Sequence, residues 1–142
     1  VRSEISDAYW QRFHFLGRVP CEVFLSVLQV SRVHVYLTYP FVLSWSLIKA
    51  MSAECAIVAS DTAPVKEVIK NGKTGVLMDF FDTKALVRRI DSLLMDEKRR
   101  AKLGAAARAF AVKNYDLQSR CLPAQLKWVD KLAKLPIKTQ SS

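Results

Sequence analysis

Short hydrophobic runs that alternate with longer helical stretches constrain this chain more than any other feature of its sequence. The runs are nearly continuous in apolar residues, which is typical of parallel strands covered on both faces. Helices between them would lay successive strands side by side through right-handed crossovers. We therefore predict an α/β fold with a Rossmann-like parallel sheet of about four strands, formed by residues 12–16, 33–38, 56–60 and 75–79.

Helical periodicity and end signals place helices between the strands and after the last one. Ser44 and either Asp82 or Thr83 stand where a side chain would cap the first turn of a helix. Pro123 is expected to kink the final helix. The predicted helices span residues 21–31, 44–53, 64–71, 82–96, 97–115 and 116–135.

Length and composition narrow the class of protein. The 142 residues, 51% of them hydrophobic, allow one domain over residues 1–135, with a disordered tail over 136–142. Three cysteines without C-x-x-C spacing and two histidines argue against a disulfide framework and against a metal site. The sequence shows no secretory signal and no membrane span, so we expect a cytoplasmic protein.

The formal charge of +9 has two interpretations. The basic residues of 96–113 and of the C-terminal segment are either solvated helix faces or a surface attracted to phosphates or anionic lipid. Peripheral contact with the inner face of a membrane follows from the second interpretation. Basic residues are not interleaved with aromatic ones, which argues against a nucleic-acid partner.

Function is expected at the loops that follow the strands, because ligands of parallel α/β sheets bind outside the carboxyl ends of the strands. These loops are residues 17–20, 38–44, 60–64 and 79–82. Ser44 begins a helix directly after a strand, and the free amides of such a helix start bind anions, most often phosphate. The alternative is that Ser44 only caps its own helix. Asp61, which follows the third strand, either faces the same crevice or caps a helix.

Three stretches of the sequence together resemble a known protein family: "FLGRVP", "VSRVHVYLTYPF" and "AMSAECAIVASDTAPVKEVIKNGKTGVLMDFFD". Their order and spacing over residues 15–79 resemble the C-terminal half of the retaining, group 1 nucleotide-sugar glycosyltransferases of GT-B architecture. Residues 83–135 fit the C-terminal helices of that family in pattern only. The resemblance implies an incomplete half of a GT-B enzyme with extra C-terminal helices. It also implies that residues 12–16, without their usual neighbours, pair directly with residues 33–38.

The resemblance also implies site residues. Arg18 and Val19 would contact the base of the donor nucleotide, and Leu43 and Ser44 would hold its diphosphate. The family places two glutamates seven residues apart here, the first on the transferred sugar and the second on the ribose. Those positions are Phe41 and Lys49 in this chain.

Lys49 reverses the chemistry of its position, because an ammonium donates hydrogen bonds and a carboxylate accepts them. Two interpretations remain: the lysine contacts the diphosphate instead, or the chain no longer binds nucleotide. Glu54 stands where the family has glycine, so the following turn is expected to fit less well.

The resulting expectation is a domain that binds a nucleotide-diphosphate sugar for hexose transfer to a glycan or lipid-linked acceptor. The donor is a substrate, no cofactor is implied, and no catalytic residue is assigned. Little or no turnover is expected of this chain alone, because an N-terminal GT-B domain would hold the acceptor. Self-association through an exposed sheet edge is a further expectation. The alternative is a degenerate, non-catalytic module that binds partners through its basic helices.

Overall fold

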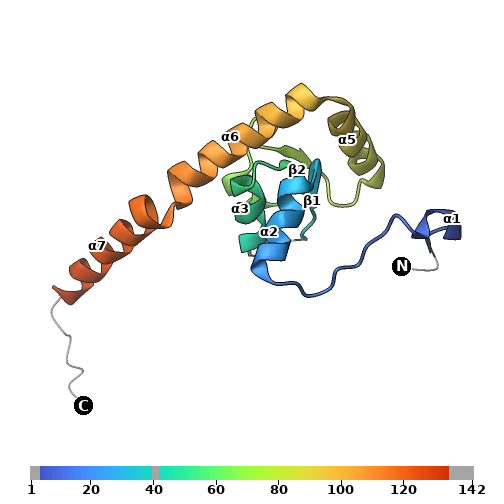
Figure 1. Cartoon of the computed structure of the whole chain (residues 1–142). Helices are drawn as coiled ribbons and strands as arrows, with labels where there is room; N and C mark the ends of the chain where they lie inside the picture. The colour runs from blue at the N-terminus through green and yellow to red at the C-terminus, as the bar shows by residue number, and fades with distance from the viewer. Residues whose placement is uncertain (1–3, 40–41, 135–142) are drawn as a thin grey trace, which may run out of the picture.

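A computed structural model describes residues 4–39 and 42–134 of the chain. Its centre is a parallel sheet with strand order β1-β2-β3, in which β1 is Val33–Tyr36, β2 is Ala56–Ser60 and β3 is Val76–Met78 (Figure 1). Val58 of β2 lies opposite Val35 of β1 and Val76 of β3. The predicted α/β class and parallel sheet are confirmed.

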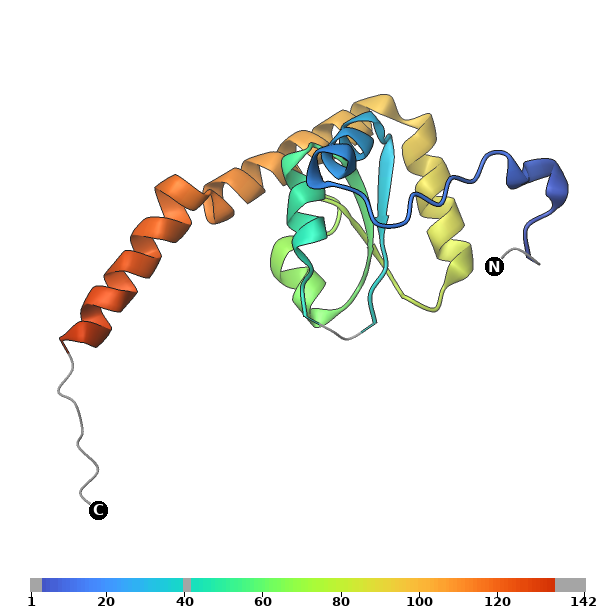
Figure 2. The same ribbon diagram turned by 60° about the horizontal axis from the view of Figure 1, so that its bottom comes forward.

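The strand predicted at residues 12–16 is wrong, and so is its pairing with residues 33–38. This stretch is irregular and leads from the short helix α1 (Asp7–Trp10), which lies apart from the sheet, back toward the body of the molecule (Figure 2). Its apolar side chains contact the nearby Trp10, whose ring centroid lies 6.4 Å from that of Phe13 and 5.7 Å from that of Phe15. The described sheet has three strands because these local contacts take the place of pairing with β1.

Three helices cover one face of the sheet: α2 (Cys21–Val30), α3 (Trp45–Ser52) and α4 (Ala63–Val68). Ile57 and Ala59 project to this face from the central strand and are fully buried. The helices contribute buried side chains to the same core cluster, among them Leu28, Leu47, Met51, Val65 and Val68. The apolar stripes of these three helices explain why they pack on this face of the sheet.

The opposite face is covered by α5 (Thr83–Met95), which begins at the N-cap Asp82. Val58, Val76 and Met78 meet Leu93 there in a second cluster. Figure 2 shows the strands between α5 on one side and α3 and α4 on the other. Both faces of the sheet are therefore covered, as the hydrophobic runs predict.

The long helix α6 (Glu97–Tyr115) connects the two clusters, since Leu103 belongs to one and Ala107 to the other. Gly104 lies against the backbone carbonyl of Glu54, which a Cβ atom at position 104 would strike. Glu54 itself has a φ of 62°, a left-handed conformation that favours glycine. The sequence expectation of a poorly fitting turn at Glu54 is confirmed.

Two helix ends differ from the expected ones. The helix expected over 64–71 ends at Val68, because the backbone turns extended at Ile69 to bury that side chain. The last helix breaks before Pro123 rather than at it: a π-helical turn, Leu117–Cys121, precedes α7 (Leu122–Ala133). Pro123 lies in the first turn of α7, where a proline is tolerated because those amides need no helical acceptor.

Helix α7 extends away from the sheet, and none of its residues is buried (Figure 1). The predicted disordered tail, 136–142, lies outside the described residues. Among the described helices, none combines the length and the hydropathy needed to cross a bilayer.

Candidate functional site

The carboxyl ends of the three strands meet at one edge of the sheet, where Ser60 fixes the start of the loop after β1. Ser60 is fully buried at the end of β2. Its hydroxyl donates to the carbonyl of Thr38 at 2.7 Å and accepts from the Thr38 amide at 2.9 Å. This reciprocal pair holds the chain in place two residues after β1 ends.

Ser44 caps helix α3, as the sequence predicts. Its side-chain oxygen accepts from the amide of Ser46 at 3.2 Å, and its own amide donates to the hydroxyl of Tyr36 at 3.1 Å. Leu43, directly before it, packs against the core. The serine hydroxyl is therefore engaged in capping, while the helix start remains exposed at the carboxyl end of the sheet. Diphosphate binding by Leu43 and Ser44 stays a prediction.

Lys49 reaches from α3 toward the beginning of α2. Its ammonium nitrogen lies 3.2 Å from the sulfur of Cys21 and 5.9 Å from the centroid of the Phe24 ring. Arg18 and Val19 come just before α2 in the chain, the first exposed and the second half-buried. The structure thus brings the lysine beside the helix that follows the predicted base-binding segment. Phe41, the other predicted sugar contact, lies outside the described residues.

A pocket of about 310 Å³ opens beside the loop that follows β1, at the carboxyl ends of β2 and β3. It is lined by Tyr39, Asp61, Thr62, Ala63, Pro64, Asp79, Phe80 and Phe81. The strand pattern predicts function at these loops, but it does not single out their aromatic residues. The available signal was that aromatic residues follow two strands closely, as in "TY" and "DFF".

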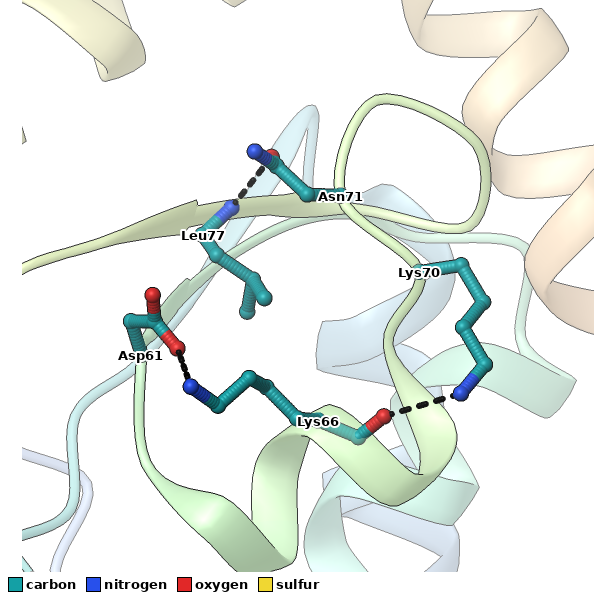
Figure 3. Close-up of polar contacts among 5 residues, drawn as sticks. All are labelled: Asp61, Lys66, Lys70, Asn71 and Leu77. Carbon is teal, nitrogen blue, oxygen red and sulfur yellow. Dashed lines mark hydrogen bonds and ion pairs between the residues drawn. The ribbon is translucent and has the colours of Figure 1, made fainter.

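Polar contacts hold both ends of α4, and one of them involves Asp61 of the pocket lining (Figure 3). The Asp61 carboxylate pairs with the ammonium of Lys66 at 2.9 Å, and Lys70 donates to the Lys66 carbonyl at 3.1 Å. The side-chain oxygen of Asn71 accepts from the amide of Leu77 at 3.0 Å, which ties the turn after α4 to β3. Asp61 lines this pocket and does not cap α4, whose N-cap residue is Thr62.

Two titratable groups are perturbed by burial: the half-buried His34 in β1 and the buried Cys55 just before β2. Burial lowers the pKa of the His34 imidazole, whose Nε2 is buried without a hydrogen-bond partner among the described residues. Burial also raises the pKa of the Cys55 thiol, which donates to the carbonyl of Leu28. Over residues 4–39 and 42–134, no three His, Cys, Asp or Glu side chains are grouped to hold a metal ion.

Comparison with known proteins relates this architecture to sugar-transferring enzymes. One curated relative is the GDP-mannose-dependent alpha-(1-6)-phosphatidylinositol monomannoside mannosyltransferase of Mycolicibacterium smegmatis. It is 30% identical over 73 residues, which is 51% of this chain and 19% of the relative. An uncharacterised glycosyltransferase of Methanocaldococcus jannaschii is 29% identical over 72% of this chain and 26% of its own length. The match thus spans about a fifth of the first relative's length and about a quarter of the second's.

Solved structures share the fold over most of the chain. The Anabaena protein HepE in complex with UDP and glucose superposes with a TM-score of 0.77 at 17% identity, covering 90% of this chain and 34% of HepE. The sucrose-phosphate synthase of Thermosynechococcus elongatus has a TM-score of 0.76 at 22% identity, covering 89% and 32%. At these identities the likeness concerns the fold.

The family "Glycosyl transferases group 1" matches residues 8–110, a range that contains the whole sheet, both helical layers and most of α6. The chain belongs to the group 1 glycosyl transferases.

Proposed function

We propose that this chain is the donor-binding part of a hexosyltransferase, which holds a nucleotide-diphosphate sugar at the starts of α2 and α3. The observation that carries the proposal is the contact between Lys49 and Cys21, which brings the ribose-contact position of the family beside α2. One relative is named for its dependence on GDP-mannose, and HepE was solved with UDP and glucose. Both names support a nucleotide donor.

The proposed contacts divide the donor among three short segments. Backbone groups around Arg18 and Val19 face the base, and the exposed start of α3 at Leu43 and Ser44 faces the diphosphate. Lys49 stands at the ribose position as a donor only, so it leaves the ribose hydroxyls without a charged acceptor. Nucleotide binding is therefore weaker than a glutamate at this position would give.

Transfer itself needs an acceptor held in line with the donor. We propose a glycan or lipid-linked acceptor, held by an N-terminal domain of GT-B type, and little or no turnover by this chain alone. The site of action is proposed to be cytoplasmic, at or near the inner face of a membrane. The exposed, lysine-bearing helix α7 is compatible with attraction to such a surface.

A titration of the ¹⁵N-labelled chain with UDP and with GDP, followed by NMR, tests the proposal. Shifts are expected at residues 17–20 and 42–49. Uridine without phosphates is the control and is expected to cause much smaller shifts at 42–49. Shifts that follow the basic residues of α6 and α7 instead would overturn the proposal.

A second candidate function rests on a specific observation, the lysine at position 49 in place of a carboxylate. A degenerate, non-catalytic module would bind an anionic partner through its basic helices, and its nucleotide crevice would be empty in solution. The same titration separates the two functions by the residues whose signals move.

A further inference from the structure

The pocket at the ends of β2 and β3 has a composition that the nucleotide site does not explain. Its volume of about 310 Å³ lies at the lower end of the range found for small-molecule sites. It is separate from the start of α3, because neither Leu43 nor Ser44 lines it. Its lining comes from the three loops at the carboxyl edge of the sheet and from the first turn of α4.

Three aromatic rings form one wall of this pocket. The centroid of Tyr39 lies 5.6 Å from that of Phe80 and 5.4 Å from that of Phe81, and the two phenylalanine rings are 5.0 Å apart at 86°. These edge-to-face contacts hold the rings against one another. Phe81 nevertheless keeps 73% of its surface exposed, and Tyr39 keeps 60%. The rings of Tyr39 and Phe81 are held in place by these contacts but remain exposed, so they offer flat apolar faces to a ligand.

The remaining wall is polar and acidic. The Asp61 carboxylate is held by Lys66, while one oxygen of Asp79 accepts from the Phe81 amide at 2.7 Å. Each carboxylate has further lone pairs that can accept hydrogen bonds from a ligand. Thr62 also lines the pocket, and its buried hydroxyl oxygen has no hydrogen-bond partner among the described residues.

We propose that this pocket binds a neutral pyranose ring of a glycan. The C–H face of a sugar ring packs on an aromatic face, and its hydroxyl groups donate to carboxylate oxygens. Two carboxylates disfavour a phosphate or another anion, and an apolar ligand would leave them desolvated without a partner. The rings contact one another at 5.0 to 5.6 Å instead of enclosing a space, which disfavours a cage for an organic cation.

We assign this ring to a part of the glycan acceptor that extends from the N-terminal domain to this pocket; that assignment rests on the proposed function, whereas the binding of the ring does not. A sugar titration without nucleotide therefore tests the pocket independently. Failure of sugar binding would leave nucleotide shifts at residues 17–20 and 42–49 unaffected, and failure of nucleotide binding would leave the pocket's shifts unaffected.

The experiment titrates the labelled chain with methyl α-D-glucopyranoside and with maltose. Shifts are expected at residues 39, 61–64 and 79–81. Phe81→Ala should weaken binding roughly fivefold to tenfold, and Phe81→Tyr, which keeps the ring, should bind like the parent. Trp128→Ala removes an aromatic side chain of α7 that is also largely exposed, and it should change nothing.

Three outcomes would overturn the proposal. One is that neither sugar shifts the pocket residues. Another is that Phe81→Ala, shown to be folded by circular dichroism, binds the sugars as tightly as the parent. The third is that tetramethylammonium chloride, titrated as a cationic probe, binds to these residues more tightly than either sugar does.

Discussion

The ammonium nitrogen of Lys49 and the sulfur of Cys21 are 3.2 Å apart, although 28 residues separate them in the sequence. This contact joins α3 to the first residue of α2 at the surface of the molecule. The two segments in which we predict the nucleotide contacts are therefore neighbours. Lys49, which joins these segments, is positively charged, whereas the family has a negatively charged glutamate at this position.

Lys49→Glu is expected to bind UDP and GDP about tenfold more tightly than the parent. A carboxylate accepts hydrogen bonds from the ribose hydroxyls, and bonds to charged groups contribute about 1.5–3 kcal/mol. The loss of attraction between an exposed ammonium and the diphosphate costs less, about 1 kcal/mol at most. NMR titration gives both dissociation constants.

Lys127→Glu is the matched control, since it makes the same charge change on the exposed surface of α7. It should bind like the parent. Weaker binding by Lys49→Glu would show that the lysine itself holds the phosphates.

Ser60→Ala is expected to lower the free energy of unfolding by about 1–3 kcal/mol, because it leaves both the amide and the carbonyl of Thr38 without their buried partner. Urea denaturation measures the loss. Ser52→Ala removes a hydroxyl that bonds only to the carbonyl of Ile48 in its own helix, and should cost much less. Equal losses in the two variants would contradict the role assigned to Ser60.

Glu54→Gly is expected to raise the free energy of unfolding by about 1 kcal/mol, because glycine adopts the left-handed backbone of this position without a Cβ penalty. The variant also loses the exposed ion pair with Arg108, which is worth about 0.5 kcal/mol or less. Glu54→Ala removes the same ion pair but keeps the Cβ atom, so it should not stabilise. A gain in both variants would place the cause in the charge rather than in the backbone.

Gly104→Ala is expected to destabilise the protein by about 2 kcal/mol or more, since the added Cβ strikes the Glu54 carbonyl and α6 must move away from the turn that contains Glu54. Intrinsic helix propensity acts in the opposite direction, by about 1 kcal/mol in favour of alanine. Ala105→Gly, at an exposed position of the same helix, measures that propensity alone. The explanation is wrong if Gly104→Ala is as stable as the parent in urea.

His34 is expected to make stability fall as the pH is lowered. Burial lowers its pKa in the folded state, so the unfolded chain binds a proton first as the pH drops through the ordinary histidine value of 6.5. Stability is full above that value and decreases until the pH reaches the lowered pKa of the folded state. Urea midpoints at a series of pH values measure the slope.

His34→Gln should flatten this slope. The exposed His14 provides the comparison, and His14→Gln should retain the slope of the parent. A slope that survives in His34→Gln would assign the pH dependence to other groups.

Local signals in the sequence predict much of this fold, because they act over a few neighbouring residues. The caps at Ser44 and Asp82 form as expected, since a serine or aspartate before an apolar periodic stretch needs only its own first turn as a partner. The runs around Val58 and Val76 are strands because both of their faces have helices to pack against. Such features require no knowledge of distant segments.

Residues 12–16 show what local signals leave undetermined. Their composition favours a strand, but a strand also needs a neighbour, and Trp10 offers the rings of Phe13 and Phe15 a closer contact. The aromatic wall of the pocket was missed for a related reason. Tyr39 and Phe80 are brought together only by the order of the strands, and neither position shows this by itself.

The position of β1 has a consequence for how readily parts of the sheet open locally. In the described sheet β1 is an edge strand that bonds only to β2, while the loop that leads to Ser44 continues directly from it. Edge segments open at a lower free energy than central ones, so the amides of β1 should exchange with solvent sooner than those of β2. A ligand that holds the loop would therefore also slow exchange in the strand, and protection of β1 becomes a remote reporter of occupancy at α3.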